Sequence, residues 1–350
     1  MEETNTTFNL NKIFNRLVIV ISIGILAHLI FLLYTTDREI MSHLNQLRPS
    51  YIFLILGLIM VPWLGHSIRL VIWTKFLDVP LKFKECFRIA VTTDLGSSIT
   101  PTLIGGGPIK LGMLMKKKIS AGKAGTLTLL GGFEDFIMYL AAFLTACFFL
   151  KDTIISVFVN LYRTIVENAT TVLTILAVFF LIRWLMRRFF SASLWSLIPQ
   201  KLRTIIYKIS IALRRGYQEM KEAFSLIFKR GKLRFLLSFS ILLVQWTAKF
   251  SILIVILTAL KLPFNTPQMY LQQWLVYLSM IFIPTPGATG GAEASFYFIF
   301  NGEVDKKFLP LIVSVWRFFT YYMILFSAVV MVQLFSIYDL HFRNKPVNPS

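Results

Sequence analysis

Charged side chains are scarce in this sequence, and their scarcity excludes an ordinary soluble fold. Asp, Glu, Lys and Arg make up 15% of the 350 residues, whereas hydrophobic residues make up 56% and the mean hydropathy is +0.69. A soluble domain carries about 25% charged residues and cannot hide this much apolar surface from water. The composition therefore predicts an all-α polytopic integral membrane protein.

Cysteine and the common catalytic fingerprints are also lacking. The two cysteines, Cys86 and Cys147, cannot form a disulfide framework and have no metal-binding spacing. The sequence contains no P-loop or dinucleotide fingerprint. We therefore predict no catalytic residues, no metal site and no cofactor. The net charge of +19 is assigned to loops that face anionic lipid, and nucleic acid is not expected as a partner.

Long apolar runs divide the chain into membrane spans. Six of them are long enough, or nearly so, to cross about 30 Å of hydrocarbon. Two further apolar runs, 87–109 and 269–300, are interrupted by glycine and proline. The six full spans are expected at about 17–34, 51–72, 124–149, 170–185, 235–260 and 308–338.

Basic residues between these runs set the predicted topology, because cytoplasmic loops are enriched in Lys and Arg. Of the 36 Lys and Arg residues, 26 lie in the two termini and in segments 73–88, 110–123 and 183–234. Only seven lie in the four remaining loops. We therefore expect a multi-pass protein of the cytoplasmic (inner) membrane of a prokaryote, with both termini in the cytoplasm.

The two interrupted runs are expected to form re-entrant helical hairpins. This topology makes run 87–109 enter and leave the membrane on the cytoplasmic side, and run 269–300 do so on the external side. Broken backbone is tolerated at membrane depth only where protein or a water-filled cavity satisfies its polar groups. Each hairpin therefore predicts a polar cavity inside the protein.

An internal repeat with an offset of 183 residues relates the two halves. Both hairpin turns, ITPTLIGGGPIK and FIPTPGATGGAE, contain Pro-Thr followed by a glycine cluster. The same offset places His66 on Lys249 and Glu134 on Arg317. Each half has three spans and a hairpin, and the odd number of crossings predicts an inverted repeat. Interrupted segments at matching positions are typical of the central site of a transporter.

The chain is interpreted as a single transmembrane domain over residues 1–350. Its first half covers about 12–150 and its second half about 170–340. Apolar residues recur at helical spacing among Lys and Arg in segment 195–234. This pattern predicts a basic amphipathic linker helix on the cytoplasmic leaflet.

Ionisable side chains inside apolar runs are candidate binding residues, since an unpaired charge at the bilayer centre costs about 2.5 kcal/mol or more. We favour a pair between Glu134 and Arg317 across the axis of the repeat, and Arg69 could extend to the interface. The alternative for any one residue is an ion pair that only fixes helix packing. The substrate-binding candidates are Arg317, Lys249, Glu134, Asp135, Glu293, Gly105, Gly106, Gly107, Gly290 and Gly291, and the secondary candidates are Arg69, His66 and Asp94.

The glycine clusters precede points where a helix is expected to resume. Backbone amides at such helix N-termini bind anions, including phosphate. Glycine also permits tight turns and close helix packing, and both roles stay open.

Two stretches resemble the signatures of the lysylphosphatidylglycerol synthase transmembrane-region family. They are ITPTLIGGGPIKLGMLMKKKISAGKAGTLTLLGGFEDF, and PTPGATGGAEASF followed by SVWRFFTYY. The resemblance extends from about Leu17 to Tyr338 and implies a membrane region like that of a lipid flippase. The family is best known as the N-terminal part of multiple peptide resistance factors, which make aminoacylated phosphatidylglycerol and move it outward. Its charged motif positions correspond here to Glu134, Asp135, Glu293 and Arg317.

The sequence departs from those factors in two respects. They carry a cytosolic aminoacyl transferase domain after the last span, whereas about a dozen residues follow the last span here. We therefore expect no synthase activity. The first hairpin reads Gly-Gly-Gly-Pro-Ile-Lys, where relatives are expected to carry an acidic or amide residue near the third glycine.

These observations predict a lipid translocase. Arg317, Lys249 and the glycine-turn amides would take a phosphate, and Glu134, Asp135 and Glu293 a cationic headgroup or a coupling proton. The expected partners are membrane lipids (an anionic or aminoacylated phospholipid, or a polyprenyl phosphate) and envelope-biosynthesis enzymes. Two alternatives stay open: a membrane-embedded lipid-modifying enzyme, and a non-transporting scaffold for envelope lipid and glycan synthesis. The oligomeric state is not predicted.

Overall fold

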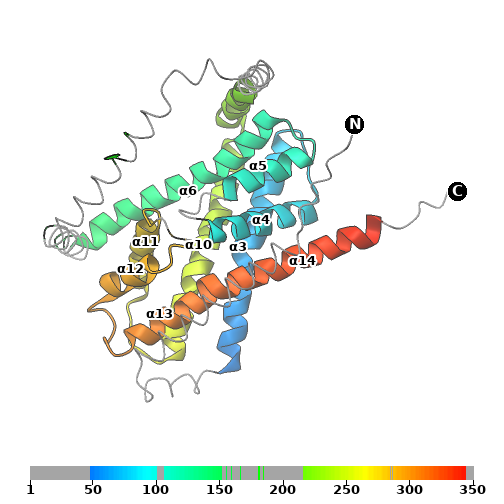
Figure 1. Ribbon diagram of the computed structural model, residues 1–350. Coiled ribbons are helices and arrows are strands. Elements are labelled where there is room, and N and C mark those ends of the chain that lie inside the picture. The colour runs from blue at the N-terminus through cyan, green and yellow to red at the C-terminus, as the bar shows by residue number, and fades with distance from the viewer. Residues whose placement is uncertain are drawn as a thin grey trace.

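The structure is an assembly of helices (Figure 1). The computed structural model describes residues 48–100, 106–151, 216–283 and 287–343, together with Thr285 and single positions between 155 and 184. An isolated bridge between Asn301 and Val304 is the one non-helical pairing in this part of the chain. The expected spans at 17–34 and 170–185 lie wholly or largely outside the described residues.

The described helices fall into two series. The first series comprises α3 (Pro49–Phe76), α4 (Phe83–Ile99), α5 (Gly106–Lys116) and α6 (Ala121–Phe149). The second comprises α10 (Lys232–Ala259), α11 (Thr266–Met280), α12 (Gly291–Phe300), α13 (Leu309–Arg317), the π-helical turn η3 (Phe318–Tyr322) and α14 (Met323–Arg343).

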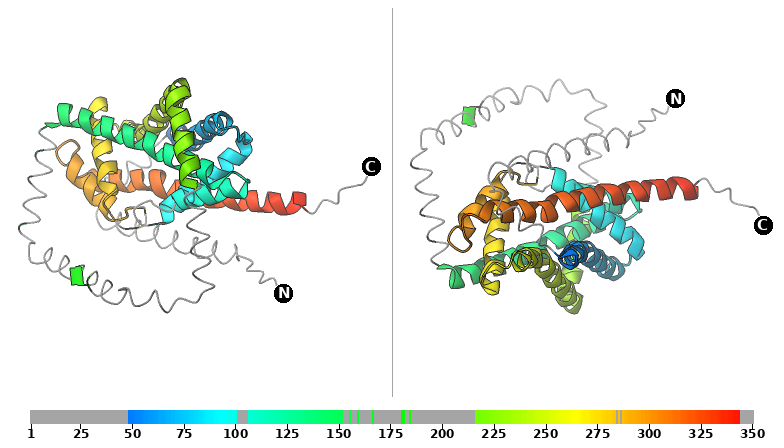
Figure 2. Two further views of the ribbon diagram at one scale, coloured as in Figure 1. Left: turned by 90° about the horizontal axis from the view of Figure 1, so that it is seen from above. Right: turned by 90° about the horizontal axis from the view of Figure 1, so that it is seen from below.

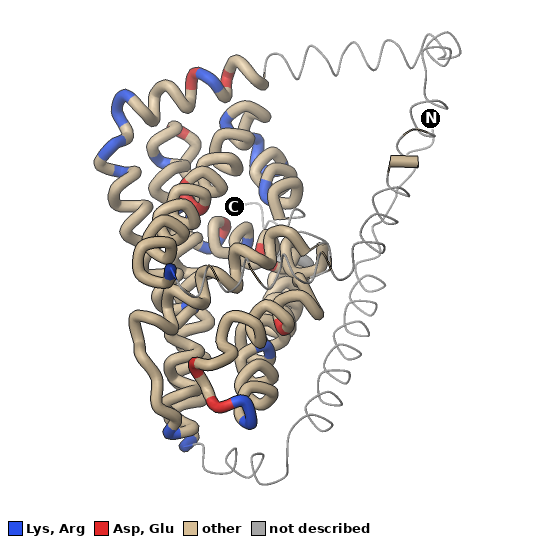
Figure 3. Tube along the Cα trace, turned by 90° about the vertical axis from the view of Figure 1, so that its left-hand side faces the viewer, with Lys and Arg blue, Asp and Glu red and all other residues tan. Residues whose placement is uncertain are grey.

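Four helical segments are long and apolar enough to cross a membrane: α3, α6, α10 and the continuous segment Leu309–Ile337. They coincide with four of the six expected spans. Their outward surfaces carry large exposed hydrophobic side chains, including Phe148 and Leu233, which are both 80% exposed. Charged residues gather toward the ends of the assembly (Figure 3). A surface of this kind suits lipid and would be unstable in water. The chain is therefore a membrane protein.

Helix order repeats along the chain. Adding 183 to the bounds of α3, 49 and 76, gives 232 and 259, which are the bounds of α10. The same shift takes 83, where α4 begins, to 266, where α11 begins. The helices α4 and α5 contact each other, as do α11 and α12, so each interrupted run is a helix pair. Entry of these pairs into a membrane, and inversion of the halves, stay predictions.

The two series interlock through their long helices. α3 and α10 pack along each other, α4 contacts α14, and α11 contacts α6. The first helix of each pair thus packs against the last long helix of the other series. Figure 1 shows α6 and α14 as two long diagonal helices, and α4 lies between them in that view; Figure 2 shows the same two helices from above and from below.

The described part of the expected linker helix packs on the protein. Residues 216–230 are helical, and Gly231 separates them from α10. Ala223 and Ile227 are buried in a cluster that includes Leu114 and Leu127 of the first series. Part of the apolar surface of this segment therefore packs on the first series, whereas Leu226 and Phe228 are exposed, and its position on the cytoplasmic leaflet stays a prediction. Residues 195–215 lie outside the described residues.

One glycine at the second turn has a backbone conformation that other residues rarely adopt. Gly287 has φ +59°, and a Cβ atom there would overlap the Tyr321 ring. Gly57, on the exposed face of α3, has no neighbouring atom within 4 Å of an added Cβ.

We therefore expect Gly287→Ala to lower the free energy of unfolding by at least about 1–2 kcal/mol, the cost of the left-handed conformation alone. Gly57→Ala serves as the matched control and should be neutral or stabilising by up to about 1 kcal/mol, because alanine favours a helix. Thermal unfolding of the two purified variants in detergent measures both effects. Equal stability of the variants would contradict the described turn.

Candidate functional site

A buried ion pair joins the two longest helices of the first series. Arg69 of α3 and Glu134 of α6 are 6% and 1% exposed, and their side chains form a salt bridge. The Trp73 indole donates a hydrogen bond to Glu134 Oε1 at 3.1 Å. Arg69 Nε also approaches Ser238 Oγ of α10 at 3.3 Å. Glu134 is therefore neutralised within its own half.

A second, partly buried ion pair lies at the turn between α11 and α12. Arg317 Nε donates to Glu293 Oε1 at 2.6 Å, and Arg317 Nη2 donates to the Gly287 carbonyl at 2.9 Å. Glu293 Oε2 accepts a hydrogen bond from the Gly290 amide at 2.7 Å, which caps α12. The π-helical turn η3 begins at Phe318, directly after Arg317, and π-helical turns are frequent at functional sites.

These contacts correct two of the predictions made from the sequence. Glu134 pairs with Arg69 and not with Arg317, and Arg69 is a buried pairing residue that does not extend to the interface. Residues related by a repeat meet each other only if both lie close to its axis. Glu134 and Arg317 instead each pair with an opposite charge on a helix that packs beside their own. This pairing avoids the free-energy cost of leaving either charge buried without a partner.

A central cavity of about 340 Å³ opens between the two series. The Lys249 ammonium lies 4.9 Å from the Trp246 ring centre and 4.5 Å from that of Tyr277, close enough for cation–π attraction. Asp94 accepts a hydrogen bond from the Trp63 indole at 2.8 Å. Candidate residues that line this cavity are His66, Arg69, Asp94, Asp135, Lys249 and Arg317.

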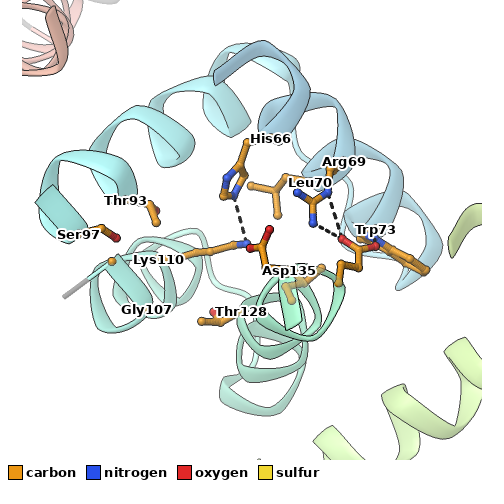
Figure 4. A pocket seen from close by; sticks show the side chains of 15 residues that line it. His66, Arg69, Leu70, Trp73, Thr93, Ser97, Gly107, Lys110, Thr128 and Asp135 are labelled. Carbon is orange, nitrogen blue, oxygen red and sulfur yellow. Dashed lines mark hydrogen bonds and ion pairs between the residues drawn. The ribbon is translucent and has the colours of Figure 1, made fainter. Parts of the chain in front are cut away.

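A smaller cavity of about 270 Å³, here called the first cavity, lies among α3, α4, α5 and α6 (Figure 4). Lys110 points from α5 across it, and its Nζ lies 3.3 Å from His66 Nε2. Gly106 and Gly107 line the cavity where α5 begins. Five residues line both cavities, so the two spaces adjoin; they are His66, Arg69, Thr93, Ser97 and Asp135.

The remaining glycine candidates have structural positions. Gly290 begins α12 with φ +84°, and Gly291 packs so closely on Ile283 that a Cβ would overlap it. Neither residue lines the two cavities. Gly105 lies outside the described residues.

Lys110 is a site residue that the sequence reasoning missed. It was counted as a cytoplasmic loop residue, yet it is 6% exposed and faces the first cavity. The repeat contained the signal, because adding 183 to 110 gives 293, the position of the candidate Glu293. The charge at this position is positive in the first half and negative in the second.

The fold and its buried charges define a class: a helical membrane protein with ionisable groups around internal cavities. Residues 17–328 match the family described as the lysylphosphatidylglycerol synthase TM region, and the chain belongs to this family. It is also 24% identical over 346 residues to a UPF0104 membrane protein of Archaeoglobus fulgidus. That alignment covers 93% of this chain and 98% of the relative.

The observed pairing predicts which charge substitutions are coupled. Glu134→Gln should leave the Arg69 charge buried without its counter-ion and destabilise the protein by about 3–5 kcal/mol. Combining it with Arg69→Gln should restore part of this loss. Combining it with Arg317→Gln should give the sum of the single losses to within about 0.5 kcal/mol, because the two residues share no partner.

Thermal unfolding in detergent of the three single and two double variants measures these couplings. Recovery of stability in the Glu134→Gln, Arg317→Gln double variant would contradict the pairing described here.

Proposed function

We propose that this protein moves a lipid headgroup across the membrane through the two adjoining cavities while the acyl chains stay in the bilayer. The observation that carries the proposal is that charged side chains from both halves line a joined interior space. Such groups are costly inside a membrane and typically mark a substrate or ion pathway. Membership of the lysylphosphatidylglycerol synthase TM region family supports a role connected with lipid.

In this proposal each side of the central cavity takes one kind of headgroup charge. Lys249 and Arg317 attract a phosphate, and Arg317 is held in position by Glu293 and Gly287. Asp94 and Asp135 attract a cationic group or carry a coupling proton. Anionic or aminoacylated phospholipids and polyprenyl phosphates all carry groups of these kinds.

The two helix pairs act as gates in the same proposal. The pair α4–α5 would re-enter the cytoplasmic side of an inner membrane and α11–α12 the external side, with the halves inverted. The repeated helix order and the reciprocal packing support this arrangement. Envelope-biosynthesis enzymes would supply or consume the lipid.

Reconstitution into liposomes tests the proposal directly. Headgroup-labelled phosphatidylglycerol in both leaflets is exposed to a membrane-impermeant quencher, and only translocation makes the inner-leaflet label accessible. Lys249→Met should slow this exchange about tenfold, because it keeps the apolar stem but removes the charge near Trp246 and Tyr277. Lys232→Met removes the same charge from the start of the same helix, away from the cavities, and should have no effect.

The same liposomes separate translocation from lipid modification. The proposal expects the lipids extracted after the assay to have unchanged masses. A new lipid species that depends on the protein would instead favour a membrane-embedded enzyme. Equal exchange in protein-containing and empty liposomes would leave the scaffold alternative standing.

A further inference from the structure

Lys110 is a buried cation that belongs to no salt bridge in the described part of the chain. It is 6% exposed, and its ammonium contacts the His66 ring. Among the residues that the structure describes, the ion pairs join Arg69 to Glu134, Lys117 to Glu85 and Arg317 to Glu293, and none includes Lys110. A buried ammonium is stable only when an opposite charge or several acceptors compensate it. Lys110 therefore faces a space in which a negative group would be stabilised.

The walls of the first cavity supply further groups that suit an anion. α5 has 11 residues and begins with Gly106 and Gly107, which line the cavity, so their two backbone amides and the positive end of the helix dipole lie at its wall; Pro108, the third residue, has no N–H to add. The Thr93 hydroxyl oxygen is buried and has no hydrogen-bond partner within the described part of the chain. Ser97 provides one more hydroxyl group at the wall, whereas the Thr128 hydroxyl already donates to the Ala124 carbonyl at 2.8 Å. A tetrahedral oxyanion could use all three kinds of donor.

The second half shows what occupies the equivalent position. The offset of 183 takes Gly107 to Gly290 and Lys110 to Glu293. The Glu293 carboxylate lies at the N-terminus of α12, where it accepts hydrogen bonds from the Gly290 amide at 2.7 Å and from Arg317 Nε at 2.6 Å. The second half thus holds an internal anion between a helix N-terminus and a basic side chain. In the first half Lys110 stands at the position of Glu293, and the N-terminus of α5 and the Lys110 ammonium both line the first cavity.

We propose that the first cavity binds the phosphate group of a lipid headgroup. Lys110 Nζ and the first amides of α5 take the phosphate oxygens, and the Thr93 hydroxyl donates a further hydrogen bond. The volume of about 270 Å³ accommodates a headgroup phosphate but not a whole lipid, so the acyl chains lie outside the cavity. The proposal rests on the proposed function and adds the residues that recognise the phosphate.

The negative charge of Asp135 should repel a phosphate in the first cavity. Asp135 lines the same cavity, and its carboxylate is close enough to Lys110 and Arg69 to interact with both electrostatically. Removing its charge should therefore tighten phosphate binding, whereas removing the charge of Lys110 should weaken it. A surface that attracted anions only through net charge would also respond to a lysine outside the cavity. Lys116 is such a residue, because it is exposed at the far end of α5.

The test titrates two probes into the purified full chain in a neutral detergent at constant ionic strength. The probes are inorganic phosphate and dihexanoyl phosphatidylglycerol, a short-chain lipid, and the readout is the ligand-dependent rise in unfolding temperature. We expect both probes to bind and the lipid to bind more tightly. Lys110→Gln should weaken both affinities about tenfold, the loss typical of one charge-assisted hydrogen bond. Asp135→Asn should tighten both, and Lys116→Gln should change neither.

Glu293→Ala keeps the proposal testable if Lys110→Gln fails to fold. This variant opens the carboxylate position in the second half and leaves Arg317 and the Gly290 amide facing it. Inorganic phosphate should then stabilise the variant more than it stabilises the natural sequence. Absence of this gain would contradict the comparison between the halves.

Other outcomes overturn the proposal separately from the proposed function. Equal affinities in the natural sequence and in Lys110→Gln would exclude the first cavity as the phosphate site, even if liposomes showed translocation. Binding of inorganic phosphate without binding of the short-chain lipid would exclude a lipid headgroup as the ligand. Lys110-dependent lipid binding in a protein that fails to move lipid would support the phosphate site and overturn translocation.

Discussion

The cost of burying charge in an apolar protein governs how this structure is organised. Burying an ion costs several kcal/mol of hydration free energy, and attraction to a nearby partner is needed to offset this cost. The salt bridge between Arg69 and Glu134 offsets the cost in the first half, and the salt bridge between Arg317 and Glu293 offsets it in the second half. Lys249 lies against two aromatic rings instead. The two salt bridges connect α3 with α6 and α12 with α13. Lys110 and Asp135 belong to neither salt bridge and line the first cavity.

The repeat gives the two halves the same helices with different electrostatics. Trp63 contacts Asp94 in the first half, and at the positions shifted by 183 Trp246 contacts Tyr277. Lys110 and Glu134 correspond to Glu293 and Arg317, so the sign of both charges is reversed. Each half has one ion pair, Arg69–Glu134 in the first and Arg317–Glu293 in the second, and the first half also encloses the first cavity. Two halves with the same helix order can therefore carry different charges, so that one half can bind a ligand at a position where the other half has an ion pair.

The apolar pattern predicted the framework well, because length and hydrophobicity act locally along the chain. Four expected spans match helices, and the interrupted runs match the pairs α4–α5 and α11–α12. The offset found from two glycine turns also relates the bounds of α3 to those of α10. The same reasoning missed Lys110, since a lysine just after an apolar run looks like a loop residue. The contacts of Gly290 and Gly291 are those of a turn, which is one of the two roles left open for them, and their part in binding stays a prediction.

The sequence by itself determined the class of protein, the positions of the described long helices and most of the ionisable residues inside apolar runs, with Lys110 as an exception. Each of these depends on composition or on neighbours a few residues away, so it can be read without coordinates. The tertiary structure alone decided which charge pairs with which. Arg69 and Glu134 are 65 residues apart, and they meet because α3 and α6 bring them to the same depth. A one-dimensional pattern contains the charges but not the rotation and depth of each helix, and these decide which side chains face a cavity.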